Sequence, residues 1–273
     1  MESLVADPAN IAQIAEGKTK IIYSIRGHED FVLIRSKDQL TAFNATRKNI
    51  LEGKARIANK TTINVFKLLN SIGLATHFVE EAGINQFIAK SCKMIPIEWV
   101  ARRIATGSFL KRNPGVPQGY RFDRPKIETF FKCYFHDDAN DDPQYSDEQI
   151  ECAKFEFNGV KIGKIEVNLM KRMTSVIFRV LEKCWSKKNC VLIDMKVEFG
   201  VTCDKQIVLA DVIDNDSWRV WPHGDKRLQL DKQLYSFPVL KSSKRIFATL
   251  VLSTTKQALL LNFRFIFIDF SLE

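Results

Sequence analysis

Short runs of hydrophobic residues, separated by polar turns, dominate the first third of the chain. Residues 21–25 and 31–34 are β-branched or aromatic runs on either side of a polar, glycine-containing segment, and this pattern predicts an antiparallel hairpin. From Val65 to Ile72 apolar residues recur at helical spacing and stop at Gly73, a residue that suits a helix end. Further short apolar runs indicate strands at residues 77–79, 87–89 and 95–101. The N-terminal part is therefore predicted to be a sheet-rich lobe.

The second half of the chain carries longer elements. Glycine and proline between residues 115 and 125, followed by an acidic run at 137–143, indicate an irregular connection. Ser146 and Gln149 have the spacing of a capping box at a helix start. A long helix is predicted from apolar residues that trace one helical face: Ile165, Leu169, Met173, Val176, Ile177, Val180, Leu181 and Cys184. Strand-like runs at 190–199 and 206–213 complete a mixed α+β pattern.

Composition narrows the class of protein. With 273 residues, of which 45% are hydrophobic, the chain can bury a sizeable core. The formal charge of +9 favours an anionic partner, either a small phosphorylated ligand or a nucleic acid. A basic nucleic-acid-binding module is thus the alternative function, although acidic residues are interleaved with the basic ones throughout.

The chain also has the features of a cytosolic protein. Its first ten residues lack the basic start and apolar centre of a secretory signal, and none of the six cysteines forms a Cys-x-x-Cys pair. The most apolar stretch, residues 258–270, contains Asn262, Arg264 and Asp269, so we do not expect it to span a membrane.

The run from Leu192 to Gly200 carries the strongest local evidence of chemistry. In a strand, Asp194, Lys196 and Glu198 share one face, while Ile193, Met195, Val197 and Phe199 share the other. A turn centred on Asp204 and Lys205 would place Glu198 directly opposite Asp211. Opposed carboxylates destabilise a sheet unless a cation neutralises them, and either Mg²⁺ or Lys196 would do so. Both alternatives remain open at this point.

Two other segments have the residue types of anion sites. Gly17, Lys18 and Lys20 lead into the first predicted strand, where backbone amides and ammonium groups would suit a triphosphate. Arg102 ends an apolar strand shortly before Ser108, whose hydroxyl and amide would suit a phosphate. A solvated turn with two lysines is the competing interpretation of the first segment, and a strand end with surface arginines is that of the second.

Taken together, these motifs resemble a known family. Met94 to Glu98, Arg102 and Thr106-Gly107-Ser108, with Asp194-x-Lys196-x-Glu198-Phe199-Gly200, closely resemble the two signatures of the SAICAR synthetase (phosphoribosylaminoimidazole-succinocarboxamide synthase) family. The resemblance extends over about residues 14–233 and is strongest to the animal form. That form is the N-terminal part of a bifunctional enzyme with an AIR carboxylase domain, and no such domain follows in this sequence.

The resemblance implies a fold and a reaction. The fold is a two-lobed α+β structure similar to other ATP-dependent ligases and kinases, with antiparallel sheets and flanking helices. Residues 1–95 would form an ATP-binding lobe and residues 96–233 a ligase lobe, followed by an atypical apolar tail at 234–273. The implied reaction condenses CAIR with L-aspartate at the cost of ATP, through an acyl phosphate, in purine synthesis. We expect a homo-oligomer in the cytosol with small-molecule substrates, without nucleic acid or membrane partners.

The same resemblance assigns roles near the nucleotide. ATP would contact the residues of the first lobe and its boundary, namely Gly17, Lys18, Lys20 and Met94. Glu198 and Asp211 would bind Mg²⁺.

It also assigns roles around the substrates. Arg102, Ser108 and Arg219 would hold the phosphate of CAIR. The reacting groups would be oriented by three further residues, Lys196, Asp194 and Asp216. The sequence departs from the family pattern at Phe43, at residues 133–136 and from Leu234 onward, and the last of these, the apolar tail, is predicted to be a solubility liability.

Overall fold

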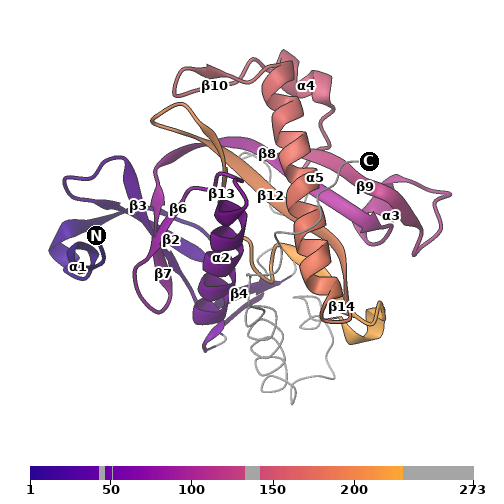
Figure 1. Cartoon of the computed structure of the whole chain (residues 1–273), viewed down its shortest axis with the longest axis horizontal. Helices are drawn as coiled ribbons and strands as arrows, with labels where there is room; N and C mark the ends of the chain where they lie inside the picture. The colour runs from indigo at the N-terminus through magenta and orange to yellow at the C-terminus, as the bar shows by residue number, and fades with distance from the viewer. Residues whose placement is uncertain (43–46, 51, 133–141, 230–273) are drawn as a thin grey trace.

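The computed structural model describes residues 1–42, 47–50, 52–132 and 142–229. Phe43, the segment at 133–136 and the apolar tail lie outside these residues. The described residues form two five-stranded antiparallel sheets, two small two-stranded sheets (β4 with β5, β10 with β11) and flanking helices, which confirms the predicted α+β class. Figure 1 shows the two larger sheets side by side, with α2 (Lys54–Ser71) near the middle and α5 (Lys164–Ser186) across the second sheet.

The first sheet belongs to the N-terminal lobe. Its five strands run in the order β1-β2-β3-β7-β6, with bounds β1 (Ile11–Glu16), β2 (Lys20–Ile25), β3 (Phe31–Ser36), β7 (Gln86–Lys90) and β6 (Phe78–Glu81). The predicted hairpin is confirmed as the antiparallel pair β2 and β3. The predicted helix is α2 (Lys54–Ser71), and Gly73 behind it is left-handed with φ 82°. Short elements complete this lobe: α1 (Glu2–Val5), η1 (Pro8–Asn10), β4 (Gln39–Ala42) and β5 (Arg47–Ile50).

The second sheet runs in the order β13-β12-β8-β9, and β14 pairs with β12. Its strands are β8 (Cys92–Ile104), β9 (Arg121–Phe131), β12 (Cys190–Thr202), β13 (Ile207–Ala210) and β14 (Trp218–Pro222). The lobe boundary expected at residue 95 thus falls inside β8, because the first sheet ends at Lys90. Smaller elements surround the sheet: α3 (Ser108–Arg112), α4 (Asp147–Cys152), β10 (Glu156–Phe157), β11 (Val160–Lys161) and η2 (Lys226–Leu228). The capping box of Ser146 and Gln149 is confirmed at the start of α4.

The long predicted helix is α5 (Lys164–Ser186), but its buried face differs from the predicted one. Met173, Ile177 and Leu181 are buried as expected, whereas Ile165 is 79% exposed. Leu169 and Val176 are also exposed. The buried face is instead completed by other residues of the helix: Val167, Met170, Phe178 and Trp185. Among the described residues, no helix has the length and apolar character needed to cross a bilayer.

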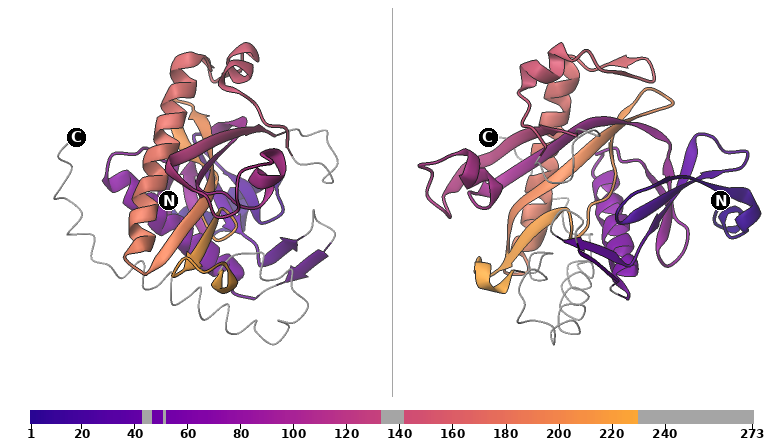
Figure 2. Two further views of the ribbon diagram at one scale, coloured as in Figure 1. Left: turned by 90° about the vertical axis from the view of Figure 1, so that its right-hand side faces the viewer. Right: turned by 180° about the vertical axis from the view of Figure 1, so that it is seen from behind.

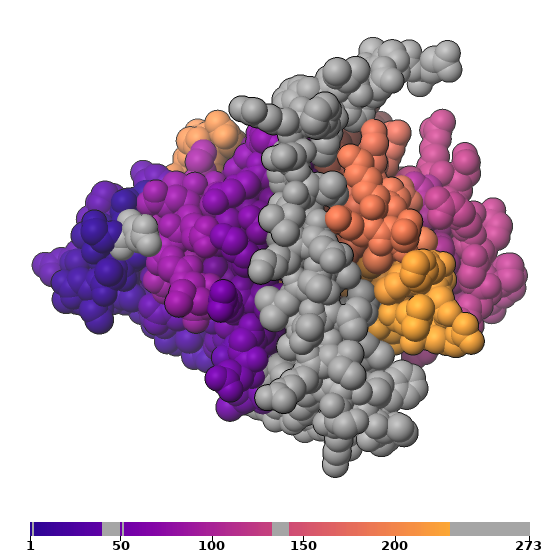
Figure 3. Space-filling model, turned by 60° about the horizontal axis from the view of Figure 1, so that its bottom comes forward, coloured from indigo at the N-terminus to yellow at the C-terminus, as the bar shows by residue number. Residues whose placement is uncertain are grey.

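One hydrophobic core joins the two lobes. It contains Phe66 of α2 and Val32 of β3 together with Trp99 of β8 and Val197 of β12. A smaller apolar cluster, which includes Val5 and Leu33, covers the opposite face of the first sheet. The right-hand view of Figure 2 shows α2 between the two sheets, and in Figure 3 the described residues of the two lobes lie at opposite ends of the visible face. The polar residues described below therefore lie where two lobes with a common core meet.

Candidate active site

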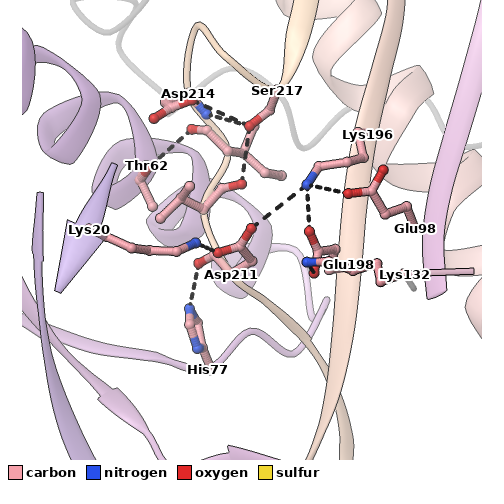
Figure 4. Close-up of polar contacts among 12 residues, drawn as sticks. Lys20, Thr62, His77, Glu98, Lys132, Lys196, Glu198, Asp211, Asp214 and Ser217 are labelled. Carbon is pink, nitrogen blue, oxygen red and sulfur yellow. Dashed lines mark hydrogen bonds and ion pairs between the residues drawn. The ribbon is translucent and has the colours of Figure 1, made fainter. Parts of the chain in front are cut away.

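Six charged side chains meet between the two sheets, and we call them the lysine cluster: Lys20, Lys132, Lys196, Glu98, Glu198 and Asp211 (Figure 4). Lys196 is at its centre, with Nζ 3.1 Å from Glu98 Oε1, 2.5 Å from Glu198 Oε1 and 3.9 Å from Asp211 Oδ2. Lys132 Nζ lies 2.8 Å from the other oxygen of Glu198. Lys20, from β2 of the first sheet, contacts the Asp211 carboxylate. The cluster thus joins the two lobes by alternating charges.

Strand geometry explains how Lys196 and the two glutamates come together. Lys196 and Glu198 are two residues apart on β12, so they share one face, as predicted. Glu98 of β8 is the direct cross-strand partner of Glu198. Two carboxylates are therefore opposed in the sheet, and the ammonium group of Lys196 hydrogen-bonds to both.

The opposite partner of Glu198 on β13 is not the predicted one. Glu198 pairs with Ala210 and not with Asp211. The turn is the reason, because Thr202 and Gln206 close a three-residue loop in which Lys205 is left-handed with φ 63°. Asp211 therefore follows the strand end, itself left-handed with φ 61°, and reaches the cluster through Lys20 and Lys196.

At Glu198 and Lys196, burial and the neighbouring opposite charges act on the pKa in opposite directions. Burial works against ionisation of Glu198, but Lys196 and Lys132 outweigh it and lower the pKa of Glu198 to about 2. Burial likewise disfavours the charged form of Lys196, and Glu198 and Glu98 outweigh it, so the pKa of Lys196 is raised. Burial lowers the pKa of Lys20 to about 8, although the Glu198 and Asp214 carboxylates favour its charged form. The glutamate and Lys196 are thus held ionised.

Of the two cations considered for Glu198 and Asp211, Lys196 is the one that contacts both carboxylates in the structure. Lys196 bridges Glu198 and Asp211, and the described residues contain no group of three or more His, Cys, Asp or Glu side chains arranged to hold a metal ion. The oxygen donors are nevertheless of the hard type that Mg²⁺ prefers, and Glu198 is ionised. The donor chemistry therefore fits magnesium, provided that the lysines move to other anions when it binds.

A second set of charges, the arginine network, lies farther along β12: Arg102, Arg112, Arg219, Asp194 and Glu128. Asp194 is flanked in the sheet by Arg102 on β8 and Arg219 on β14. Arg102 NH1 lies 2.9 Å from Asp194 Oδ2, and Arg219 Nε lies 2.8 Å from Oδ1. Glu128 contacts Arg102 and accepts a hydrogen bond from Arg112 at 2.8 Å. Asp194 therefore orients both arginines that were predicted to bind phosphate.

Gly107 brings the remaining predicted phosphate ligand to this network. Gly107 is left-handed with φ 61°, and a Cβ added there would lie 2.6 Å from NH1 of Arg219. Any other residue would displace the Arg219 guanidinium, and the positive φ itself favours glycine. Ser108, the next residue, begins α3. The structure thus brings Arg102, Ser108 and Arg219 to one region of the second lobe.

Asp216 lies in the loop between β13 and β14. Its carboxylate accepts a hydrogen bond from Lys54 of α2 at 2.7 Å, and its main-chain N–H donates to Asp214 Oδ1 at 2.8 Å. Asp214 is buried, and burial, together with the nearby Asp216 carboxylate, raises the pKa of Asp214. A charged pair from the two lobes, Lys54 and Asp216, therefore lies beside the buried Asp214.

The remaining predicted nucleotide residues lie next to the lysine cluster in the chain. Gly17 N–H donates to Lys20 O at 2.8 Å and closes the turn between β1 and β2, which also contains Lys18. Met94 lies on β8, four residues before Glu98. Lys20, at the end of the β1–β2 turn, is the predicted nucleotide residue that belongs to the cluster, through its contact with Asp211.

Sequence reasoning gave no role to several residues that belong to these charged groups or pair with them: Glu98, Lys132, Glu128 and Lys54. Glu98 carried a signal, because it lies in the same apolar strand as Arg102 with the spacing of one face. The others depend on contacts between residues far apart in the chain.

Comparison with known proteins identifies the family. The family model described as SAICAR synthetase matches residues 13–245. A probable multifunctional protein ADE2 of Caenorhabditis elegans is 61% identical over 86% of this chain and 55% of its own length. A phosphoribosylaminoimidazole-succinocarboxamide synthase of Herpetosiphon aurantiacus is 41% identical over 82% of this chain and 86% of its own length. The chain thus spans about half the length of its animal relatives but most of the bacterial one.

Solved structures are similar as well. A SAICAR synthetase in complex with ADP superposes with a TM-score of 0.75 at 30% identity and covers 88% of this chain and 98% of its own. The phosphoribosylaminoimidazole-succinocarboxamide synthase of Ehrlichia chaffeensis gives 0.78 at 27% identity, over 90% and 98%. These comparisons lend no support to the nucleic-acid-binding alternative.

Proposed function

Because the chain belongs to the SAICAR synthetase family, we propose that it condenses CAIR with L-aspartate to give SAICAR, ADP and phosphate. The observation that carries the proposal is the placement of two charged groups on one strand. Asp194 of the arginine network and Glu198 of the lysine cluster are four residues apart on β12, or about 13 Å at the usual rise of a strand. This separation leaves room for a ribose and an imidazole ring between a phosphate held by arginines and a carboxylate near Lys196.

The proposed reaction needs activation, since a carboxylate is a poor acyl donor to an amine. An oxygen of the CAIR carboxylate attacks the γ-phosphorus of ATP, and ADP leaves. The amine of aspartate then attacks the acyl carbon, phosphate leaves, and the amine loses a proton to solvent. Positioning and charge stabilisation dominate such phosphoryl transfer, so the lysines of the cluster supply the main effect.

Each group of residues has a place in this scheme. Lys18 and Lys20 bind the ATP phosphates, with Gly17 and the backbone near Met94 completing the nucleotide site. Lys196 orients the activated carboxylate. A solved relative in complex with ADP supports the binding of an adenine nucleotide by this chain.

Mg²⁺ belongs to the proposal. Glu198 and Asp211 would hold the ion, which supplies positive charge to the phosphates of the nucleotide. The lysines that now pair with these carboxylates would pair instead with phosphate oxygens. The carboxylates thus serve as counter-ions before the nucleotide binds.

The substrate groups follow the same logic. Arg102, Ser108 and Arg219 hold the CAIR phosphate, and Asp194 orients the two arginines. Asp216 orients the aspartate amine. We further propose that the protein is a cytosolic homo-oligomer.

A coupled assay of ADP release tests the function directly. With CAIR and Mg·ATP present, ADP release should require L-aspartate, and D-aspartate and L-asparagine should be poor substitutes. A site built for two carboxylates leaves cations unpaired when one is missing. Equal turnover with L-asparagine, or ADP release that is independent of CAIR, would reject the assignment.

A further inference from the structure

His77 is a buried side chain that has no role in the proposed reaction so far. It lies between α2 and β6, and 4% of its surface is exposed. Its ring packs edge-on against Phe66 and Phe87, with centroids 5.4 and 5.9 Å away. Figure 4 shows it pointing toward the segment that carries Asp211. An imidazole in this apolar setting needs a partner for its N–H.

The partner is a residue of the lysine cluster. Nε2 of His77 lies 2.9 Å from the main-chain oxygen of Asp211. A carbonyl oxygen only accepts, so Nε2 carries the proton and the ring is the Nε2–H tautomer. Burial, with the charge of Lys20, lowers the pKa of His77 to about 3. The ring is therefore neutral and a steady donor at neutral pH.

Main-chain bonds hold His77 itself in place. Its N–H donates to Leu209 O at 2.8 Å, and its carbonyl accepts from Lys90 N at 2.7 Å. These bonds tie it to β13 of the second sheet and to the end of β7 of the first. Thr62 of α2 makes a similar contact two residues past Asp211, where its hydroxyl donates to Ile213 O at 3.1 Å. The first lobe thus holds the Asp211 segment at two carbonyl groups.

Asp211 needs such support. It has left the strand and is left-handed, with φ 61°, a conformation that non-glycine residues adopt rarely. In this conformation its carboxylate contacts Lys20 and lies 3.9 Å from Lys196. The orientation of its peptide plane determines where the carboxylate points, and the His77 hydrogen bond acts on that plane.

We propose that His77 is a positioning residue for the proposed ligase reaction: by donating Nε2–H to the Asp211 carbonyl, it directs the Asp211 carboxylate toward Lys20 and Lys196. The inference rests on the proposed function of Asp211 in nucleotide binding. It assigns to His77 neither proton transfer nor contact with substrate. A packing role alone would predict effects on stability without effects on the nucleotide.

Two amide substitutions separate the hydrogen bond from the packing. In His77→Gln the side-chain amide nitrogen can take the place of Nε2, whereas in His77→Asn it corresponds to Nδ1 and falls short of the Asp211 carbonyl. Both variants lose the ring and bury an amide. His77→Phe is the converse control, because it keeps a ring between Phe66 and Phe87 but has no donor.

The measurements are kcat, the KM for ATP, the half-saturating Mg²⁺ concentration, and the calorimetric Kd of Mg·ADP. We expect His77→Asn and His77→Phe to weaken Mg·ADP binding and lower kcat/KM for ATP, each by about tenfold, with KM for CAIR little changed. His77→Gln should retain most of both. Equal losses in the Gln and Asn variants, or wild-type Mg·ADP binding in His77→Phe, would overturn the positioning role.

Failure of the ligase assignment can be distinguished from failure of the proposal about His77. A wild-type chain that shows no L-aspartate-dependent ADP release would contradict the ligase assignment, and the calorimetric comparison would still test His77. An active wild type whose His77→Phe variant binds Mg·ADP normally would contradict only the inference about His77.

Discussion

The lysine cluster and the arginine network lie on the same strand, yet they differ in burial and in the geometry of their contacts. In the arginine network the side chains of Arg102, Glu128 and Asp194 are 5%, 1% and 8% exposed. In the lysine cluster Lys196 is 30% exposed and Lys132 32%. Guanidinium groups form planar, two-point contacts, whereas an ammonium group is a compact charge that changes partners with little reorganisation.

The difference suggests a division of labour. The arginine network, closed by buried carboxylates, is suited to holding a fixed phosphate in one place. The lysine cluster is more open, and each of its carboxylates has a cation that a phosphate could take over. We therefore expect charge to be rearranged in the lysine cluster during the reaction while the arginine network stays as it is.

The largest effect is expected in the lysine cluster. Glu198→Gln and Asp211→Asn should each lower kcat by on the order of 10²–10³-fold and raise the Mg²⁺ requirement, because each removes a charged oxygen ligand. Steady-state rates across a Mg²⁺ titration measure this, and Glu156→Gln, a change at an exposed residue of β10, is the control. If the carboxylates serve only in salt bridges, the variants will melt at lower temperature with normal magnesium dependence.

The arginine network should give smaller and more selective effects. Arg219→Ala is expected to raise KM for CAIR about ten- to a hundredfold with little change for ATP, since a charge-assisted hydrogen bond is lost. Arg102→Ala should do the same and also lower the melting temperature, because it leaves Glu128 buried with one partner fewer. Arg227, which is 89% exposed, provides the control substitution to alanine. Unchanged CAIR affinity in both variants would reject the phosphate site.

Gly107 allows a finer test of the same network. Gly107→Ala places a methyl group 2.6 Å from NH1 of Arg219, which must then shift. Gly119→Ala also places a methyl group on a backbone with positive φ, 85°, but nothing lies within 4 Å of that methyl. We expect about a tenfold rise in KM for CAIR in Gly107→Ala only, from displacement of one arginine contact. Similar kinetics in the two variants would mean that the position of Arg219 is unimportant.

The smallest predicted effect concerns stability at low pH. The pKa of Glu198 is lowered to about 2 from an ordinary value of 4.5, so the folded state favours its ionised form. Its contribution to stability is therefore full above about pH 4.5 and is lost as the pH falls toward 2. The difference in unfolding free energy between wild type and Glu198→Gln, measured by urea titration, should shrink over that range. A constant difference would show that the charge of Glu198 does not stabilise the fold.

Local patterns in the sequence determined much of this protein. Alternation along residues 192–200 placed Lys196 and Glu198 on one face, since side chains in a strand alternate whatever the strand pairs with. The same rule was wrong at Ile193, which it placed on the apolar face with Met195. Leu192 joins the main core instead, because a bulge interrupts the pairing with β14 between Leu192 and Asp194. The family motifs pointed to residues of both charged groups.

Tertiary structure decided how these pieces meet. A three-residue turn moved Asp211 out of register with Glu198, and sequence alone could not distinguish it from a two-residue turn. Lys20 comes to Asp211, and Glu98 to Glu198, from strands about a hundred residues or more away in the chain. His77 had no pattern to reveal it, because its partner is a carbonyl group. Alternation and capping depend on neighbouring residues, whereas such contacts exist only once two sheets share a core.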